Sequence, residues 1–205
     1  MTLQASTIKF LKDLGQYNSK EWFEAHRQKY ENARLDFETF IGELIRKHAL
    51  KDPEIGDLTA KKCMFRINRD VRFSKNKLPY KTNMGASINR GGKKSVFAGY
   101  YFHLEPGESF IGGGVWMPMP GEVKKIRQEI DYCWKEFEHI LNNKKFQKFY
   151  GQLYTGEDVS LVKVPAGFEK DNPAAAFLKL KSWLAMKELT DAEITSPELA
   201  ARSIE

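Results

Sequence analysis

The chain has 205 residues, of which 41% are hydrophobic and 13% aromatic, and its 33 basic and 27 acidic side chains leave a net charge of +6. This composition can build a packed core, and it excludes disorder as the main state. No apolar run approaches the roughly 20 residues of a membrane span, and two cysteines exclude a disulfide scaffold. We therefore expect a cytoplasmic protein with reduced thiols, no secretory signal and no membrane partner.

The first fifty residues predict helices. Apolar side chains recur at helical spacing over residues 8–14. Asn18, with Glu21 three positions later, predicts an N-cap. The aromatic and aliphatic residues that follow keep a period of 3.6 to about His48. This pattern predicts one long helix or two nearly collinear ones, with an aromatic stripe that faces the core.

The middle of the chain predicts strands. Apolar and polar residues alternate at 63–67, a short strand is expected at 86–90, and the clearest alternation runs over 96–104. Pro106-Gly-Glu108 supplies a hairpin turn, and 109–117 returns as the partner strand. Strands that follow one another through short turns predict an antiparallel sheet.

The last third of the chain predicts mainly helices. The expected elements are helices at 123–141, 145–150 and 174–184, a strand at 161–164, and a final helix from Ser196. Repeats and flexible linkers are absent from the sequence. We therefore predict a single α+β domain over residues 1–205, in which an antiparallel sheet from the middle of the chain packs against N- and C-terminal helices.

The positive charge is concentrated in one segment. Between Lys61 and Lys94 lie eleven Lys or Arg residues and one acid, Asp70, a local excess of ten positive charges. Since the total is +6, the rest of the chain carries a net charge of −4. Such a field attracts phosphates, carboxylates, nucleic acids or acidic proteins.

A motif within this segment carries a family resemblance. The run from Phe65 to Lys81 resembles the pattern Arg-x-x-Arg-Asp-x-Arg-Phe-x-x-Asp-Lys-x-Pro-Tyr-Lys of an uncharacterised bacterial and fungal family, catalogued as domain of unknown function 2461. The matching residues are Arg66, Arg69, Asp70, Arg72, Phe73, Lys77, Pro79, Tyr80 and Lys81. Asn76 stands where that family commonly has an acid. The resemblance extends from about Phe10 to Ser182 and implies an α+β domain, but no activity.

The same motif predicts an anion site. Arginine binds oxyanions through its planar fork, and lysines add point charges. The candidate anion-binding residues are Arg66, Arg69, Arg72, Lys75, Lys77 and Lys81. The favoured partner is a small ligand that bears phosphate or carboxylate, bound by a protein that could be an enzyme of unknown reaction. The alternatives are a non-catalytic module that binds nucleic acid or an acidic protein, and an internal network of arginines paired with Asp70 and helix carboxylates.

Three residues are candidates for proton transfer, and two of them, Asp70 and His103, also have a structural alternative. Asp70 is a candidate general base or a salt-bridge partner, and Tyr80 is a candidate within the motif. His103 lies in the clearest strand, on the same face as Tyr101, where the pair could line a pocket floor or simply be hydrogen-bonded within the sheet.

Other signatures are missing from the sequence. The histidine and cysteine spacing does not match a metal site. Gly112-Gly-Gly114 lacks the third glycine and the following helix of a dinucleotide fingerprint, so these glycines predict a bulge or the close approach of another backbone. Recognisable nucleic-acid-binding motifs are also missing, which places nucleic acid below a small anion as the expected partner.

Overall fold

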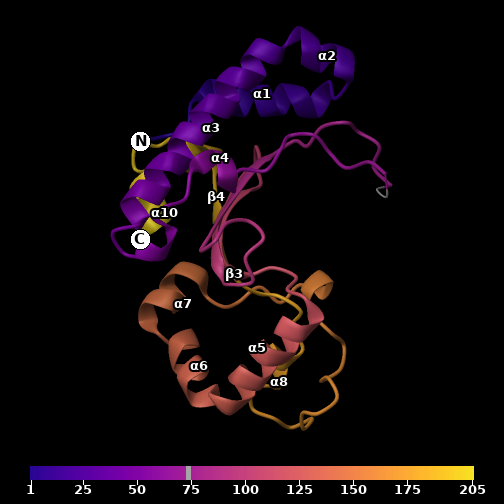
Figure 1. Ribbon diagram of the computed structural model, residues 1–205, viewed down its shortest axis with the longest axis vertical. Coiled ribbons are helices and arrows are strands. Elements are labelled where there is room, and N and C mark those ends of the chain that lie inside the picture. The colour runs from indigo at the N-terminus through magenta and orange to yellow at the C-terminus, as the bar shows by residue number, and fades with distance from the viewer. Residues whose placement is uncertain (73–74) are drawn as a thin grey trace. The chain divides into compact units, whose positions relative to one another are not determined.

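The computed structural model describes residues 1–72 and 75–205. Phe73 and Ser74, in the middle of the basic motif, lie outside the described residues. A four-stranded antiparallel sheet has the order β1–β2–β3–β4, with helices at both ends of the chain (Figure 1). The strands are β1 Met84–Asn89, β2 Gly99–Leu104, β3 Ser109–Val115 and β4 Trp183–Leu189. The predicted α+β class and the hairpin of the second and third strands are confirmed.

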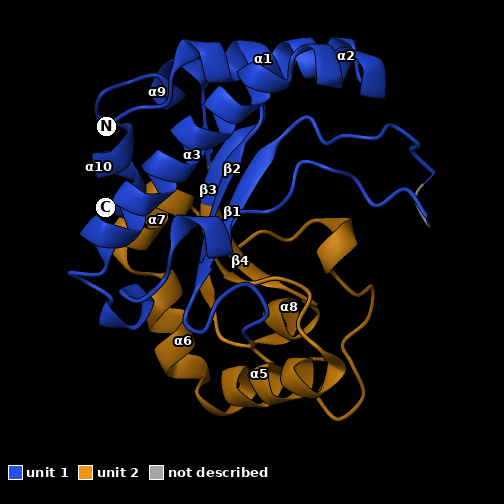
Figure 2. Cartoon of the chain, turned by 45° about the horizontal axis from the view of Figure 1, so that its top comes forward, with its two compact units in different colours: residues 1–95, 100–111, 188–205 blue, residues 96–99, 112–187 orange. Residues whose placement is uncertain are grey.

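The chain forms two compact units, which Figure 2 shows in different colours. Unit 1 comprises residues 1–95, 100–111 and 188–205, and unit 2 comprises 96–99 and 112–187. The chain passes from one unit to the other before residue 96 and within β2, β3 and β4. The single domain over 1–205 stays a prediction.

Unit 1 contains the N- and C-terminal helices. These are α1 Ala5–Gln16, α2 Lys20–Ala25, α3 Arg27–His48, the 3-10 helix η1 Pro53–Ile55, α4 Ala60–Cys63, α9 Asp191–Ile194 and α10 Leu199–Ile204. Of the two predicted alternatives up to His48, one long helix or two, the structure has two helices, which are separated at His26. Ser19, rather than Asn18, caps α2, because its side chain accepts the Trp22 N–H.

The core of unit 1 joins the helices to the sheet. Phe37 and Phe40 of α3 are fully buried, and both rings lie against Phe102 of β2, at centroid distances of 6.1 and 4.9 Å. Leu11 of α1 and Leu199 of α10 belong to the same apolar cluster. The core faces of these helices follow the 3.6-residue pattern in the sequence.

Unit 2 has an apolar cluster of its own. Its helices are α5 Pro120–Tyr132, α6 Trp134–Leu141, α7 Lys144–Tyr150, the 3-10 helix η2 Glu157–Val159 and α8 Ala175–Leu178. Ile130, Leu178 and Trp183 lie in the cluster, and the Trp183 indole N–H donates to the Phe177 carbonyl at 3.1 Å. The bounds of α5 and α6 show that the helix predicted at 123–141 is two helices, which meet at Cys133.

Three predicted elements differ from the structure. The strand expected at 63–67 is reduced to isolated bridges, since α4 continues to Cys63 and Phe65 is 44% exposed. The segment expected as a strand at 161–164 is not a strand: next to it Ser160 forms an isolated bridge with Leu180, Leu161 donates to the Lys179 carbonyl, and Val162 is exposed. The helix expected at 174–184 ends at Leu178, and the chain then enters β4. Local apolar spacing predicted a helix there, whereas pairing with β3 decides the conformation.

The glycines of β3 explain how that pairing is possible. A Cβ atom at Gly112 would lie 2.7 Å from the Ala185 carbonyl oxygen of β4. A Cβ at Gly114, where φ is +133°, would overlap the Trp183 carbonyl oxygen. The predicted close approach of another backbone is confirmed, and β4 provides that backbone.

Across residues 1–72 and 75–205, none of the helices combines the length and apolar character needed to cross a membrane.

Candidate functional site

The basic motif forms a two-stranded ribbon in unit 1. The Phe65 N–H donates to the Gly85 carbonyl at 2.9 Å, Lys81 donates to Ile67 at 2.9 Å, and Arg69 donates to Pro79 at 2.9 Å. Residues 64–69 therefore run antiparallel to residues 79–86, with residues 70–78 between them. Because of this pairing, basic residues that are twelve to fifteen positions apart in sequence become neighbours.

Tyr80 anchors the ribbon to the helices. Its ring is buried and stacks on Phe23 of α2, with centroids 4.0 Å apart and planes 12° apart. Asn18 accepts the Tyr80 N–H at 3.1 Å and donates to the Tyr80 carbonyl at 3.0 Å. Burial, followed by the charge of Glu24, raises the pKa of the Tyr80 phenol. These contacts give Tyr80 a structural role, and its candidacy for proton transfer stays a prediction.

Four cations, which we call the basic cluster, gather on the ribbon and the residues after β1: Arg66, Arg69, Lys81 and Lys93. Burial lowers the pKa of Lys81, and the charges of Arg66, Arg69 and Lys93 lower it further. The Arg69 Nε–H is buried and has no hydrogen-bond partner. Within the described residues, none of the four forms an ion pair with a carboxylate. The cluster is thus an accumulation of like charges.

Phe65 holds the two lysines of the cluster together. The Lys81 and Lys93 ammonium groups lie 5.6 and 5.3 Å from the centroid of its ring, within cation–π range. The Lys93 ammonium also donates to the Met64 carbonyl at 2.5 Å. Lys93 was not among the predicted anion-binding residues, because only the turn after β1 brings it back to the ribbon.

The other predicted anion-binding residues belong to the loop between the two sides of the ribbon. The Arg72 guanidinium donates two hydrogen bonds to Asp70, at 3.0 and 2.7 Å, and the Arg72 backbone N–H donates a third at 3.3 Å; these bonds lower the pKa of the carboxyl. Asp70 therefore makes the salt bridge that was predicted as its alternative role. Lys77 donates to the Val71 carbonyl at 2.9 Å, and Lys75 is exposed. The six predicted residues are thus divided between the basic cluster and this exposed loop.

A hydrogen-bonded network lies next to the cluster, on one face of β2. Tyr101 Oη is 3.2 Å from His103 Nδ1, and His103 Nε2 is 2.9 Å from a carboxylate oxygen of Glu105. Thr82 donates to the other Glu105 oxygen at 2.5 Å, and Asn83 donates to the carboxylate at 3.5 Å. We call these five residues the Tyr–His–Glu network.

Protonation within the network follows from Glu105. Burial raises the pKa of Glu105, but the hydrogen bonds from Thr82, His103 and Asn83 outweigh it, so the pKa lies below its usual value. An ionised Glu105 can only accept, which places a proton on His103 Nε2. In the neutral imidazole Nδ1 is then an acceptor, and the Tyr101 hydroxyl donates to it.

Aromatic rings and one glycine shape the network. The His103 ring stacks on Phe110 of β3, with centroids 4.6 Å apart and planes 12° apart. The Tyr101 ring meets Phe65 edge to face at 6.3 Å. A Cβ at Gly85 would overlap the Tyr101 hydroxyl, so the position of this hydroxyl requires a glycine at residue 85. Phe65 thus contacts both the basic cluster and the network.

Sequence reasoning recognised only part of this network. His103 and Tyr101 were expected to share a face, and they do. Glu105 was overlooked, although it continues the same two-residue period beyond His103. Thr82 and Asn83 lie about twenty residues earlier, so only strand pairing brings them to Glu105.

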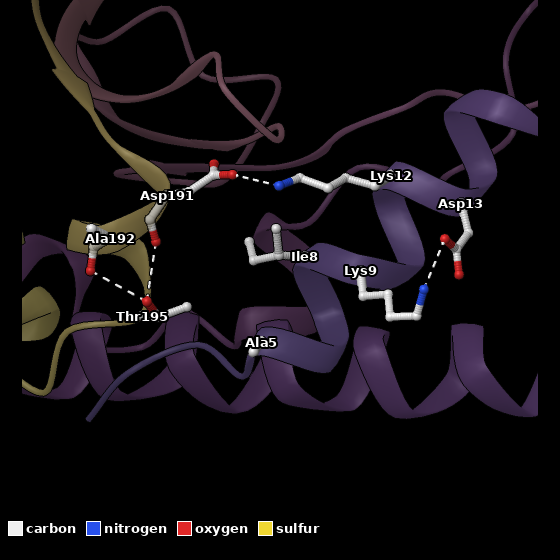
Figure 3. Close-up of a pocket in the computed structure, with 8 residues that line it drawn as sticks. All are labelled: Ala5, Ile8, Lys9, Lys12, Asp13, Asp191, Ala192 and Thr195. Atoms are coloured by element: carbon white, nitrogen blue, oxygen red, sulfur yellow. Dashed lines mark hydrogen bonds and ion pairs between the residues drawn. The ribbon is translucent and has the colours of Figure 1, made fainter.

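A surface hollow of about 410 Å³ lies elsewhere in unit 1, between α1 and α9 (Figure 3). Its charged side chains neutralise one another, with Lys12 2.8 Å from Asp191 and Lys9 3.2 Å from Asp13. The Gly107 N–H also donates to Asp191, at 2.9 Å. The hollow therefore offers a ligand little unsatisfied charge, and we do not assign a site to it.

Fold and geometry together define an α+β protein with a cationic cluster beside a hydrogen-bonded Tyr–His–Glu network. The chain belongs to the family described as conserved hypothetical protein DUF2461, whose model matches residues 6–205. No curated protein and no solved structure matches it. In the described parts of the chain, groups of three or more His, Cys, Asp or Glu side chains placed to hold a metal ion are absent.

Proposed function

We propose that this protein binds a small ligand bearing a phosphate or carboxylate group through Arg66, Arg69, Lys81 and Lys93. The observation that carries the proposal is the environment of Lys81. Burial, followed by the charges of three neighbouring cations, lowers its pKa, and no carboxylate among the described residues is paired with any of the four.

The positive charge of the basic cluster favours a bound anion. The four like charges repel one another, and burial costs Lys81 part of its hydration, so the cluster without an anion lowers the stability of the fold. A bound oxyanion would attract the cations, and its hydrogen bonds with them would replace the lost hydration. The buried Arg69 Nε–H lacks a hydrogen-bond partner, and it could donate to a bound oxyanion.

The alternatives have less support. Internal pairing describes Arg72 and Asp70, but not the basic cluster. A surface for nucleic acid or an acidic protein would present all its bases on an exposed face. In the basic cluster Arg66 and Lys93 are exposed, but Arg69 and Lys81 are half-buried. We expect weak association with nucleic acid that decreases steeply with salt. Tight, sequence-selective binding at physiological salt would reverse this ranking.

Thermal unfolding in the presence of anions tests the proposal. Phosphate or sulfate should raise the Tm of the wild type in a saturable manner, since a ligand that binds only the folded state stabilises it. Arg69→Ala should abolish this increase and leave the stability of the anion-free protein about unchanged. Lys62→Ala is the matched control, because it removes one charge from an exposed helix position of the same basic segment.

The opposite pattern would overturn the proposal. If Arg69 is a structural partner of a carboxylate, Arg69→Ala should cost about 3–5 kcal/mol in the absence of anions, as expected when a buried charge loses its partner. The wild type would then show no specific response to phosphate. An equal effect of Lys62→Ala on the response would reduce the site to general charge screening.

A further inference from the structure

The geometry points to a chemical activity beside the anion site. We propose that Tyr101, His103 and Glu105 form a proton relay, in which the Tyr101 hydroxyl accepts a proton from a substrate while it passes its own proton to His103. This inference rests on the proposed function in one respect: the basic cluster would hold the anionic group of that substrate.

The order of the groups supports a direction for the relay. Glu105 is held by Thr82 and Asn83 and accepts from His103 Nε2 at 2.9 Å, which fixes the imidazole orientation. His103 Nδ1 is thereby free to accept from Tyr101 at 3.2 Å. A carboxylate that orients an imidazole, which in turn acts as base toward a hydroxyl, is a general arrangement for activating an oxygen atom.

The surroundings suit a base that works away from bulk water. The side chains of His103 and Glu105 are 13% and 22% exposed, and Phe110 covers one face of the imidazole. Burial, followed by the charge of Glu105, raises the pKa of the Tyr101 phenol, so the resting hydroxyl is neutral. The phenol therefore needs His103 as an acceptor before it can take up another proton.

The step balances in protons and charge. A bond from hydrogen to carbon or oxygen breaks in the substrate, and that proton forms an O–H bond at Tyr101 Oη. The original phenolic proton moves to His103 Nδ1, and the resulting imidazolium is stabilised by Glu105. The substrate gains one negative charge, which the cations of the basic cluster favour, since Lys81 and Lys93 share Phe65 with Tyr101. The reaction class is proton abstraction from an anionic substrate.

Labelling of Tyr101 by an aryl sulfonyl fluoride tests the relay. In this reaction Tyr101 Oη forms a bond to sulfur, fluoride leaves, and the phenolic proton passes to His103. The probes are anionic 4-(fluorosulfonyl)benzoate and neutral benzenesulfonyl fluoride, with peptide mapping by mass spectrometry on the full chain. Tyr132, which is 90% exposed, is the internal reference.

We expect Tyr101 to react faster than Tyr132 despite its lower exposure. His103→Gln should slow the labelling of Tyr101 by about 100-fold, the usual scale of general-base assistance, and leave that of Tyr132 unchanged. Tyr101→Phe should remove the label. In the wild type the labelling rate should rise with pH and reach its plateau before pH 8, roughly two units under the ordinary phenol pKa of about 10. This measurement does not depend on the folding of any variant.

The outcomes separate the relay from the anion site. A rate at Tyr101 that is no higher than at Tyr132, or that rises only with ordinary phenol ionisation, overturns the relay, because a structural network would protect the hydroxyl. Labelling of Lys81 instead of Tyr101 also overturns it. Fast labelling of Tyr101 by both probes alike, with no competition by phosphate, supports the relay and overturns the anion site.

Discussion

The basic cluster and the Tyr–His–Glu network are neighbours in unit 1, yet they satisfy their polar groups in opposite ways. Glu105 accepts hydrogen bonds from three side chains, and its charge is matched by donors within the fold. Lys81 has cations around it and no carboxylate partner among the described residues. A group whose partners are internal stabilises the folded chain, whereas a group that lacks them gains stability only from a ligand.

The largest effect is expected at the centre of the network. Glu105→Ala should lower the free energy of unfolding by about 2–4 kcal/mol, because Thr82, Asn83 and His103 would lose their shared acceptor in a partly buried setting. Urea denaturation at neutral pH measures this difference. Glu108→Ala, in the exposed turn three residues later, is the matched control and should have little effect.

The pH dependence of stability at Glu105 sharpens the comparison between the network and the basic cluster. The pKa of Glu105 is lowered in the folded chain, so its contribution is complete above its unfolded value, near 4.5, and is lost as the pH falls through the folded pKa. The gap in stability between the wild type and Glu105→Gln should therefore narrow under acid conditions. A gap that is constant from pH 7 to pH 3 would show that Glu105 acts through packing alone.

A smaller effect of opposite sign is expected in the basic cluster. Lys81→Met should raise the stability of the anion-free protein by less than about 1 kcal/mol, because the burial of a charge and a partly exposed like-charge repulsion are both removed. The pKa of Lys81 is lowered on folding, so its cost is complete below the folded pKa and is relieved as the pH rises towards 10.5. The advantage of Lys81→Met should fade over that range, as chemical denaturation at several pH values would show.

The same variant should also lose the response to phosphate, with Lys62→Met as its control. Destabilisation by Lys81→Met at neutral pH would mean that the lysine stem or its contact with Phe65 outweighs the charge repulsion. In that case the comparison between cluster and network would no longer hold.

The smallest effect is expected at Arg72→Ala. Its ion pair with Asp70 is exposed, and pairs of this kind add little to stability. Calorimetry should give a Tm close to that of the wild type, with the response to phosphate retained. A weakened response would extend the anion site to the loop that carries Lys75 and Lys77.

Several features of this protein could be predicted from local sequence. The 3.6-residue pattern located the helices of the first fifty residues, and the alternation around Phe102 with the turn at Gly107 located the β2–β3 hairpin, because both depend on neighbours within a few positions. The glycines of β3 indicated a close backbone. β4 escaped prediction, since the apolar run before it suits a helix equally well, and only its pairing with β3 decides between the two.

The candidate site likewise has features that local sequence determines and features that depend on the tertiary structure. The sequence alone determined that eleven bases and one acid share a short segment, and that Tyr101 and His103 lie on one face of a strand, because composition and a period of two are local properties. The tertiary structure decided which cations converge on Lys81, and that Thr82 and Asn83 fix the carboxylate beside His103. Coulomb energies and hydrogen bonds depend on distances in space, and pairing between strands distant in sequence sets those distances.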